Sequence, residues 1–133
     1  MSNNYMTEHQ NDKQKRQRRM ILTDTRTLFD VFPNVAQITI NYEISHISAF
    51  GHIRINRTMI KTPSDRNDFT IDCLNRECTE GWFDLKGVIW NMIRLKQITQ
   101  SGDMRCNGYE APDHMNQSCG GTLVYKINIK YQD

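Results

Sequence analysis

Alternation of apolar and polar residues along Val35–Ser48 is the feature that most limits what this chain can fold into. Successive side chains of a β-strand point to opposite faces, so a repeat of two predicts a strand with one apolar and one wet face. The apolar positions of this repeat are Ile38, Ile40, Tyr42 and Ile44. A strand of this kind must be covered on one side, so the segment predicts a sheet with a packed layer on its apolar face.

Similar alternation predicts further strands later in the chain. His52–Met59 follows a turn at Ala49–Gly51, and the two segments together read as an antiparallel hairpin. Asp68–Cys73 is a third expected strand, and Asp103–Cys106 is a fourth. Thr122–Tyr131 alternates again and is expected to carry one apolar face and one mostly polar, basic face.

Two segments are expected to be helical. A short helix should follow Met20, with Thr23 or Asp24 accepting its first amide hydrogens and Pro33 stopping it. From Asp84 to about Gln97 the apolar residues recur at helical spacing, with Trp82 and Phe83 leading in and Asp84 as the expected N-cap. The predicted fold class is therefore α+β: an antiparallel sheet of four to five strands with one main helix packed on it.

The chain has 133 residues, the usual size of one domain. Residues 1–19 are polar and offer almost nothing to bury, so they are expected to form a disordered basic tail. Residues 20–133 are expected to form a single α+β zinc-binding domain. The low mean hydropathy of −0.68 and the lack of an apolar run of about 18–20 residues argue against a membrane span. Residues 1–20 lack a secretory signal, so the expected location is the cytoplasm.

Positive charge is concentrated in the N-terminal tail. Residues 1–20 hold five basic and two acidic residues, whereas the whole chain has a net charge of only +2. The basic residues of this arm are Lys13, Lys15, Arg16, Arg18 and Arg19. A short basic arm is attracted to phosphates or acidic surfaces, which makes these residues candidate nucleic-acid contacts. The competing interpretation is a solvated tail that keeps the protein soluble.

Four cysteines, Cys73, Cys78, Cys106 and Cys119, are the candidate metal ligands. Cysteines in a chain expected in the cytoplasm are more often metal ligands than disulfides. Thiolates favour zinc, and four of them close a tetrahedral site. Each cysteine follows, precedes or flanks a predicted element, so the four sulfurs would gather at one end of the sheet if those strands are neighbours.

Two other interpretations of the cysteines stay open. They could be buried thiols outside any metal site, or adventitious disulfides, because cysteine is common in protein cores. Alternatively His114, inside the Cys106–Cys119 loop, could replace one thiolate or complete the site. His46 and His52 are distant from the cysteines in the sequence and are interpreted as structural strand residues.

The cysteine spacing, C-x4-C followed by C-x12-C, lies over Phe69–Val124 with Gly81 and Gly120–Gly121 after the second and fourth cysteines. This arrangement loosely resembles a zinc ribbon, in which two cysteine-bearing turns hold one ion between short strands. The resemblance implies a closed structural zinc site. The stretch Cys73–Leu85 also resembles motifs of small uncharacterised bacterial proteins, which implies no activity.

Catalytic signatures are missing from the sequence. It lacks G-x-S-x-G, G-x4-G-K-[ST], H-E-x-x-H and G-x-G-x-x-G. The expected function is a non-enzymatic, zinc-stabilised binding module that contacts nucleic acid through the basic arm. A protein-interaction or adaptor module is the alternative, and a metal- or thiol-dependent enzyme is the third, less favoured interpretation.

Overall fold

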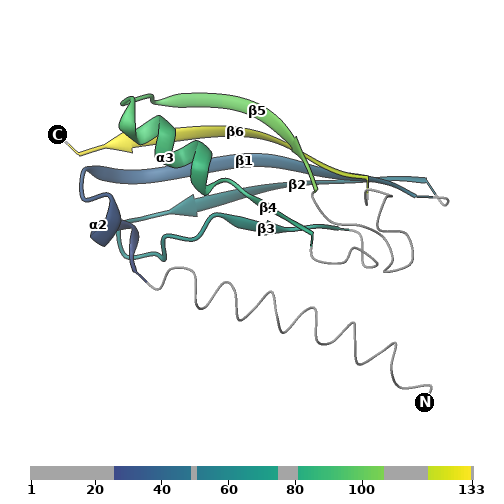
Figure 1. Cartoon of the computed structure of the whole chain (residues 1–133), viewed down its shortest axis with the longest axis horizontal. Coiled ribbons are helices and arrows are strands. Elements are labelled where there is room, and N and C mark those ends of the chain that lie inside the picture. Colours follow the sequence, from purple (N-terminus) through teal and green to yellow (C-terminus); the bar gives the residue numbers. More distant parts are fainter. Residues whose placement is uncertain (1–25, 49–50, 75–80, 107–119, 133) are drawn as a thin grey trace, which may run out of the picture.

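Most of the molecule is antiparallel sheet. A computed structural model describes residues 26–48, 51–74, 81–106 and 120–132 (Figure 1). The main sheet has four strands: β1 (Val35–Ser48), β2 (Gly51–Lys61), β5 (Thr99–Arg105) and β6 (Gly121–Tyr131). Their order is β2-β1-β6-β5, so β1 and β6 are interior strands and β2 and β5 form the edges. The two strands with the clearest sequence alternation are therefore the central pair.

The register of the sheet follows the alternation in the sequence. Ile40 of β1 stands opposite Ile127 of β6, and Ile44 opposite Leu123. These four side chains are at most 4% exposed, because they share the face on which the core is built. The predicted bounds of β1 agree with the structure residue for residue, and β1 and β2 form the expected hairpin.

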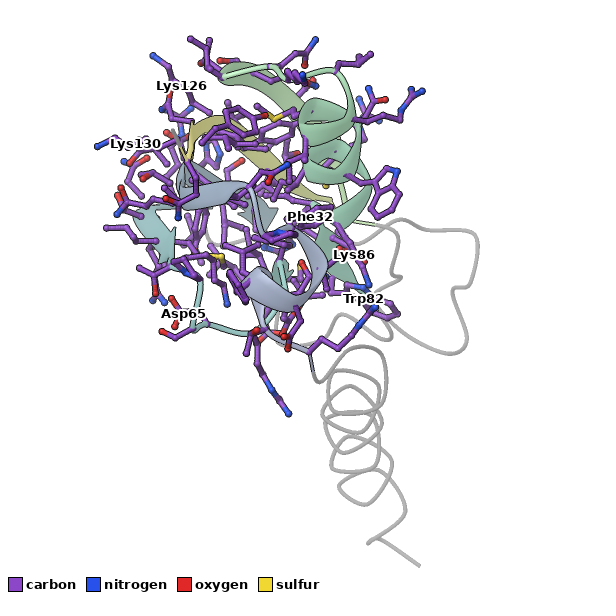
Figure 2. The ribbon with its side chains drawn as sticks, turned by 90° about the vertical axis from the view of Figure 1, so that its left-hand side faces the viewer. Phe32, Asp65, Trp82, Lys86, Lys126 and Lys130 are labelled. Atoms are coloured by element: carbon purple, nitrogen blue, oxygen red, sulfur yellow. The ribbon has the colours of Figure 1, made fainter. Side chains whose placement is uncertain are left out.

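A second layer covers one face of this sheet. It consists of helix α2 (Leu28–Val31), helix α3 (Lys86–Arg94) and a two-stranded sheet of β3 (Thr70–Asp72) and β4 (Trp82–Asp84). Figure 2 shows Lys126 and Lys130 on the opposite side of the ribbon from α3, Trp82 and Lys86. The core lies between the layers, where Phe69, Phe83 and Ile89 join the sheet's apolar side chains. The α+β prediction is thus confirmed in its coarse form.

The segment before α3 differs from the prediction. Trp82 and Phe83 belong to strand β4 instead of leading into the helix, because Phe83 pairs with Ile71 of β3 and is buried. The N-cap of α3 is Leu85, although the Asp84 carboxylate still accepts the Lys86 amide at 2.9 Å. The helix is also shorter than predicted and ends at Arg94, before the left-handed residue Lys96 (φ 55°).

Other element boundaries also differ from the prediction: β2 extends beyond the predicted His52–Met59 at both ends, and β3 is shorter than the predicted Asp68–Cys73. Strand β5 begins at Thr99, four residues before the predicted start, because β6 supplies hydrogen-bonding partners along that whole stretch. Helix α2 is capped by Thr27, whose hydroxyl accepts the Asp30 amide at 3.2 Å while the Asp30 carboxylate accepts the Thr27 amide at 3.1 Å. The caps predicted at Thr23 and Asp24 lie outside the described residues.

Neither of the two helices within the described residues is long and apolar enough to cross a membrane. This agrees with the lack of a long apolar run in the sequence.

Candidate functional site

The described cysteines belong to one end of the molecule. Strands β3 and β5 end there, and β6 begins there (Figure 1). Cys73 directly follows β3, and Cys106 directly follows β5. The other three candidate ligands, Cys78, Cys119 and His114, lie outside the described residues. Both described cysteines follow strand ends, as expected, but β3 and β5 belong to different sheets and are not neighbouring strands.

Both described cysteines face the core. Cys106 is 5% exposed, and its amide donates a hydrogen bond to the Gly121 carbonyl at 2.9 Å, which extends the pairing of β5 with β6 by one residue. Cys73 is half-buried and packs against the same core. The start of β6 therefore lies beside Cys106.

His46 also lies at this end, which the sequence analysis missed. It is 6% exposed and pairs with Gly121 across β1 and β6. A Cβ atom added to Gly120 would lie 3.9 Å from the imidazole Cδ2 of His46. Gly121 is thus flanked by His46 on one side and Cys106 on the other. The signal in the sequence was the alternation itself, because His46 continues the apolar set of Val35–Ser48.

The described residues do not by themselves form a metal site. Among residues 26–48, 51–74, 81–106 and 120–132, no three His, Cys, Asp or Glu side chains gather closely enough to hold an ion. Two of the four predicted thiolates are outside these ranges. Zinc therefore stays a prediction from the cysteine chemistry.

The outer face of the four-stranded sheet, opposite the core, is a second candidate site. We call it the outer face; it comprises the strand residues that alternate with the core-facing set. An open trough of about 860 Å³ lies over its middle. The side chains that line this trough on the outer face are Asn41, Glu43, Asn56, Thr58, Ser101, Asp103, Val124 and Lys126. The trough crosses all four strands, and most of the side chains that line it end in polar groups, for example the Thr58 hydroxyl, which donates to the Asn41 amide oxygen at 2.8 Å.

Basic residues outnumber acidic ones on the outer face of the described strands. The basic side chains are Arg54, Arg105, Lys126 and Lys130, and the acidic ones are Glu43 and Asp103. Arg54 Nε lies 3.9 Å from Glu43 Oε1, an exposed pair that water screens strongly. Arg57 and Lys61 do not belong to the outer face, because they pair with the core-facing residues Tyr42 and Ile38.

The tyrosines of β6 do not belong to the outer face. Tyr125 is buried and Tyr131 is half-buried on the core side, as their alternation with Leu123 predicted. Burial raises the pKa of Tyr125, and the negative charge of Asp103 adds to this effect. Burial also raises the pKa of Tyr131, whose hydroxyl donates to the Gln97 carbonyl at 2.7 Å. The outer face therefore offers hydrogen-bonding groups and positive charge, but no tyrosine on which a base could stack.

The basic arm from Lys13 to Arg19 lies outside the described residues, so the structure does not test it. No family model matches the sequence, and neither the curated proteins nor the solved structures include a significant match. The zinc-ribbon resemblance and the closed zinc site that it implies therefore rest on this chain's own residues.

Proposed function

We propose that this chain is a non-enzymatic binding module that contacts the phosphate backbone of nucleic acid, with its cysteine end stabilised by one Zn²⁺. The observation that carries the proposal is the outer face: an uncovered sheet surface with four basic and two acidic side chains, of which Lys126, Glu43 and Asp103 line the trough. The basic arm, with Lys13, Lys15, Arg16, Arg18 and Arg19, supplies a second set of phosphate contacts.

Charge and composition favour phosphate over base recognition. Lys126 and Lys130 extend from β6 on the uncovered side of the sheet (Figure 2), and Arg54 lies on the same face of β2. The described residues of this face contain no Phe, Tyr or Trp, so they lack a platform for stacking bases. Contacts of this kind position a nucleic acid without reading its sequence. Binding is expected to tolerate many sequences and to weaken steeply with salt.

The zinc part of the proposal rests on thiolate chemistry and on the position of the described cysteines. Cys73 and Cys106 both face the core at one end of the molecule. A closed tetrahedral site there would hold together the end of β3, the end of β5 and the start of β6. These segments are far apart in the sequence, so one ion would stabilise an arrangement that the short β3–β4 sheet cannot secure alone.

Binding to nucleic acid is tested by fluorescence anisotropy with labelled duplex DNA of unrelated sequences, over a range of salt concentrations. Replacing Lys126 and Lys130 by Ala should lower affinity and reduce the slope of log K against log salt by about 0.9 for each phosphate that is no longer neutralised. Lys86→Ala is the matched control, since it removes one positive charge from the opposite side (Figure 2). If Lys86→Ala lowered DNA affinity as much as the double variant does, the outer face would be refuted as the binding surface. A wild-type affinity that does not change with salt concentration would refute it as well.

Zinc is tested by elemental analysis of the chain purified without added metal. One zinc per chain is expected, together with thiols that react only after unfolding. Because Cys106→Ser also changes a core position, its readout is zinc stoichiometry and not stability alone. A chain without metal, whose four thiols react freely in the folded state, would remove zinc from the proposal.

A protein partner is the second candidate, and one surface favours it. Phe29 and Trp90 are each 55% exposed, and the rings of Phe32 and Trp90 pack edge to face with centroids 5.5 Å apart. Exposed aromatic clusters are common at protein interfaces. Trp90→Ala would weaken a protein complex and leave DNA affinity unchanged, which separates the two functions.

A further inference from the structure

Strand β2 is the longer of the two edges of the main sheet, with 11 residues against the 7 of β5. Within the described residues it pairs with β1 on one side and with no strand on the other. Most of its residues are exposed. It contains no proline and pairs with β1 without a bulge, so it lacks two of the usual devices that keep an edge from pairing with another chain.

The hydrogen-bonding phase of the sheet shows which backbone groups of β2 point outward. The Cys106 amide donates to the Gly121 carbonyl, so these two opposite residues form a hydrogen-bonded pair. Bonded and non-bonded pairs alternate along antiparallel strands, and a residue bonded to one neighbouring strand points its N–H and C=O away from the other. Followed through the register of β6 and β1, this alternation directs the backbone groups of five β2 residues away from β1: His52, Arg54, Asn56, Thr58 and Ile60. In the part of the chain that the structure describes, none of the five forms a backbone hydrogen bond outside the sheet.

The sequence of β2 fits a second copy of itself in one antiparallel register. When Asn56 stands opposite Asn56 of the second copy, Arg54 stands opposite Thr58, and Arg57 stands opposite Ile55. Each arginine then faces an uncharged residue. Centring the pairing on Arg54 or on Arg57 would instead place two like charges directly opposite, which is unfavourable. Asn56 is also the middle residue of the strand, so this register gives the longest overlap.

Apolar side chains flank the same edge. Ile53 lies on the core side of β2, opposite His46, yet it is 49% exposed. In the register centred on Asn56 it stands opposite Met59 of the second copy, which is a partly buried residue of the same side. Pairing would therefore continue the apolar layer past β2 and remove its exposed part from water.

We propose that β2 is the interface of a symmetric homodimer, in which two copies join antiparallel across Asn56 into one continuous sheet of four strands from each copy. The same surface is used by both copies, so the assembly closes at two. Residues directly opposite in a sheet share a face, so the two outer faces lie side by side. This inference depends on neither zinc nor nucleic acid.

The dimer is tested by sedimentation velocity of the full chain over a range of concentrations, which should show a monomer–dimer equilibrium. Asn56→Pro removes the central outward N–H of each copy at a position where an edge strand tolerates proline. Because two symmetric hydrogen bonds are lost, dimerisation should weaken at least about fivefold. Ser101→Pro is the matched control: by the same alternation Ser101 points outward from β5, and this variant should dimerise as wild type.

Three results would overturn the proposal. They are a wild-type chain that stays monomeric at every concentration, an Asn56→Pro variant that dimerises as wild type, and a Ser101→Pro variant that alone is monomeric. The last result would assign the interface to β5.

The register is tested separately with Thr58→Glu. This change places a carboxylate opposite Arg54 of the second copy at two symmetric positions, so the dimer should tighten at least about twofold. The gain should disappear in the Arg54→Ala background. A dimer whose affinity does not respond to Thr58→Glu would overturn the register centred on Asn56.

Hydrogen exchange on the unaltered chain covers the case in which the proline variants fail to fold. The outward amides of Arg54, Asn56 and Thr58 should be protected at high protein concentration and should exchange faster on dilution. The Ile55 and Arg57 amides point toward β1 and should be protected at both concentrations. Outward amides that exchange rapidly at every concentration would overturn the dimer.

Discussion

Gly102 in β5 provides a sharp test of the sheet's register. It stands directly opposite Tyr125 of β6, and both face the core. A Cβ atom at Gly102 would lie 2.5 Å from the Tyr125 hydroxyl oxygen and 2.8 Å from its Cζ. Real Cβ atoms do not approach other atoms this closely, so Gly102→Ala requires the tyrosine to move. Tyr125 is only 7% exposed and moves only by displacing its core neighbours.

The expected cost follows from two opposing effects. Overpacking a core position costs about 1–3 kcal/mol. Replacing glycine also restricts the unfolded chain, which returns about 0.4–1 kcal/mol. Gly102→Ala should therefore lower the free energy of unfolding by about 1–2 kcal/mol. Urea denaturation followed by tryptophan fluorescence measures this as a lower midpoint at an unchanged slope.

Gly87→Ala is the matched control. Gly87 lies in α3, and an added Cβ there meets no atom within 4 Å. This variant should be more stable than wild type by about 0.4–1 kcal/mol. Adding Tyr125→Phe to Gly102→Ala should recover part of the loss, since the closest atom is removed, and the two changes should be non-additive. Equal stability of the Gly102 and Gly87 variants would refute the packing of Tyr125 over Gly102.

Three further effects are expected in the same assay. Thr27→Ala should cost about 0.5–2 kcal/mol by removing the capping box of α2, and an unchanged midpoint would contradict it. Tyr131→Phe should cost about 1 kcal/mol, because its hydroxyl donates to the Gln97 carbonyl at 2.7 Å; wild-type stability would show that water replaces this bond. The Thr62 amide, and then the Thr62 hydroxyl, hold the pKa of Asp65 below its ordinary value. Because that pKa is lower in the folded than in the unfolded chain, the stability it contributes is present above the unfolded-state pKa and is lost as the pH falls through the folded-state pKa. The stability difference between wild type and Asp65→Asn should therefore shrink on acidification, and a difference independent of pH would contradict it.

Local patterns predicted the strands well and the short elements poorly. The alternation in Val35–Ser48 and Thr122–Tyr131 is long enough to define both a strand and its buried face. Trp82–Asp84 is only three residues long, which is too short for any period to be read. It is a strand because Phe83 finds a partner in Ile71, and nothing near Phe83 in the sequence indicates that pairing.

The candidate sites show the same division. Cys73 and Cys106 could be selected as candidate metal ligands from the sequence, because residue type alone indicates that role. The face on which Arg57 and Lys61 lie could not be read from the sequence, since the edge strand β2 carries exposed polar residues on both sides. His46 was passed over because sequence distance from the cysteines says nothing about distance in the fold.

By itself, then, the sequence determined which residues of each long strand face the core, since alternation is a property of neighbouring residues. Only the tertiary structure decided that β1 and β6 are the central pair and that His46, Gly121 and Cys106 share one row. Pairing between distant strands depends on register and on how whole faces pack together. A shift of one residue would have turned His46 to the opposite face, with hardly any change in the local pattern.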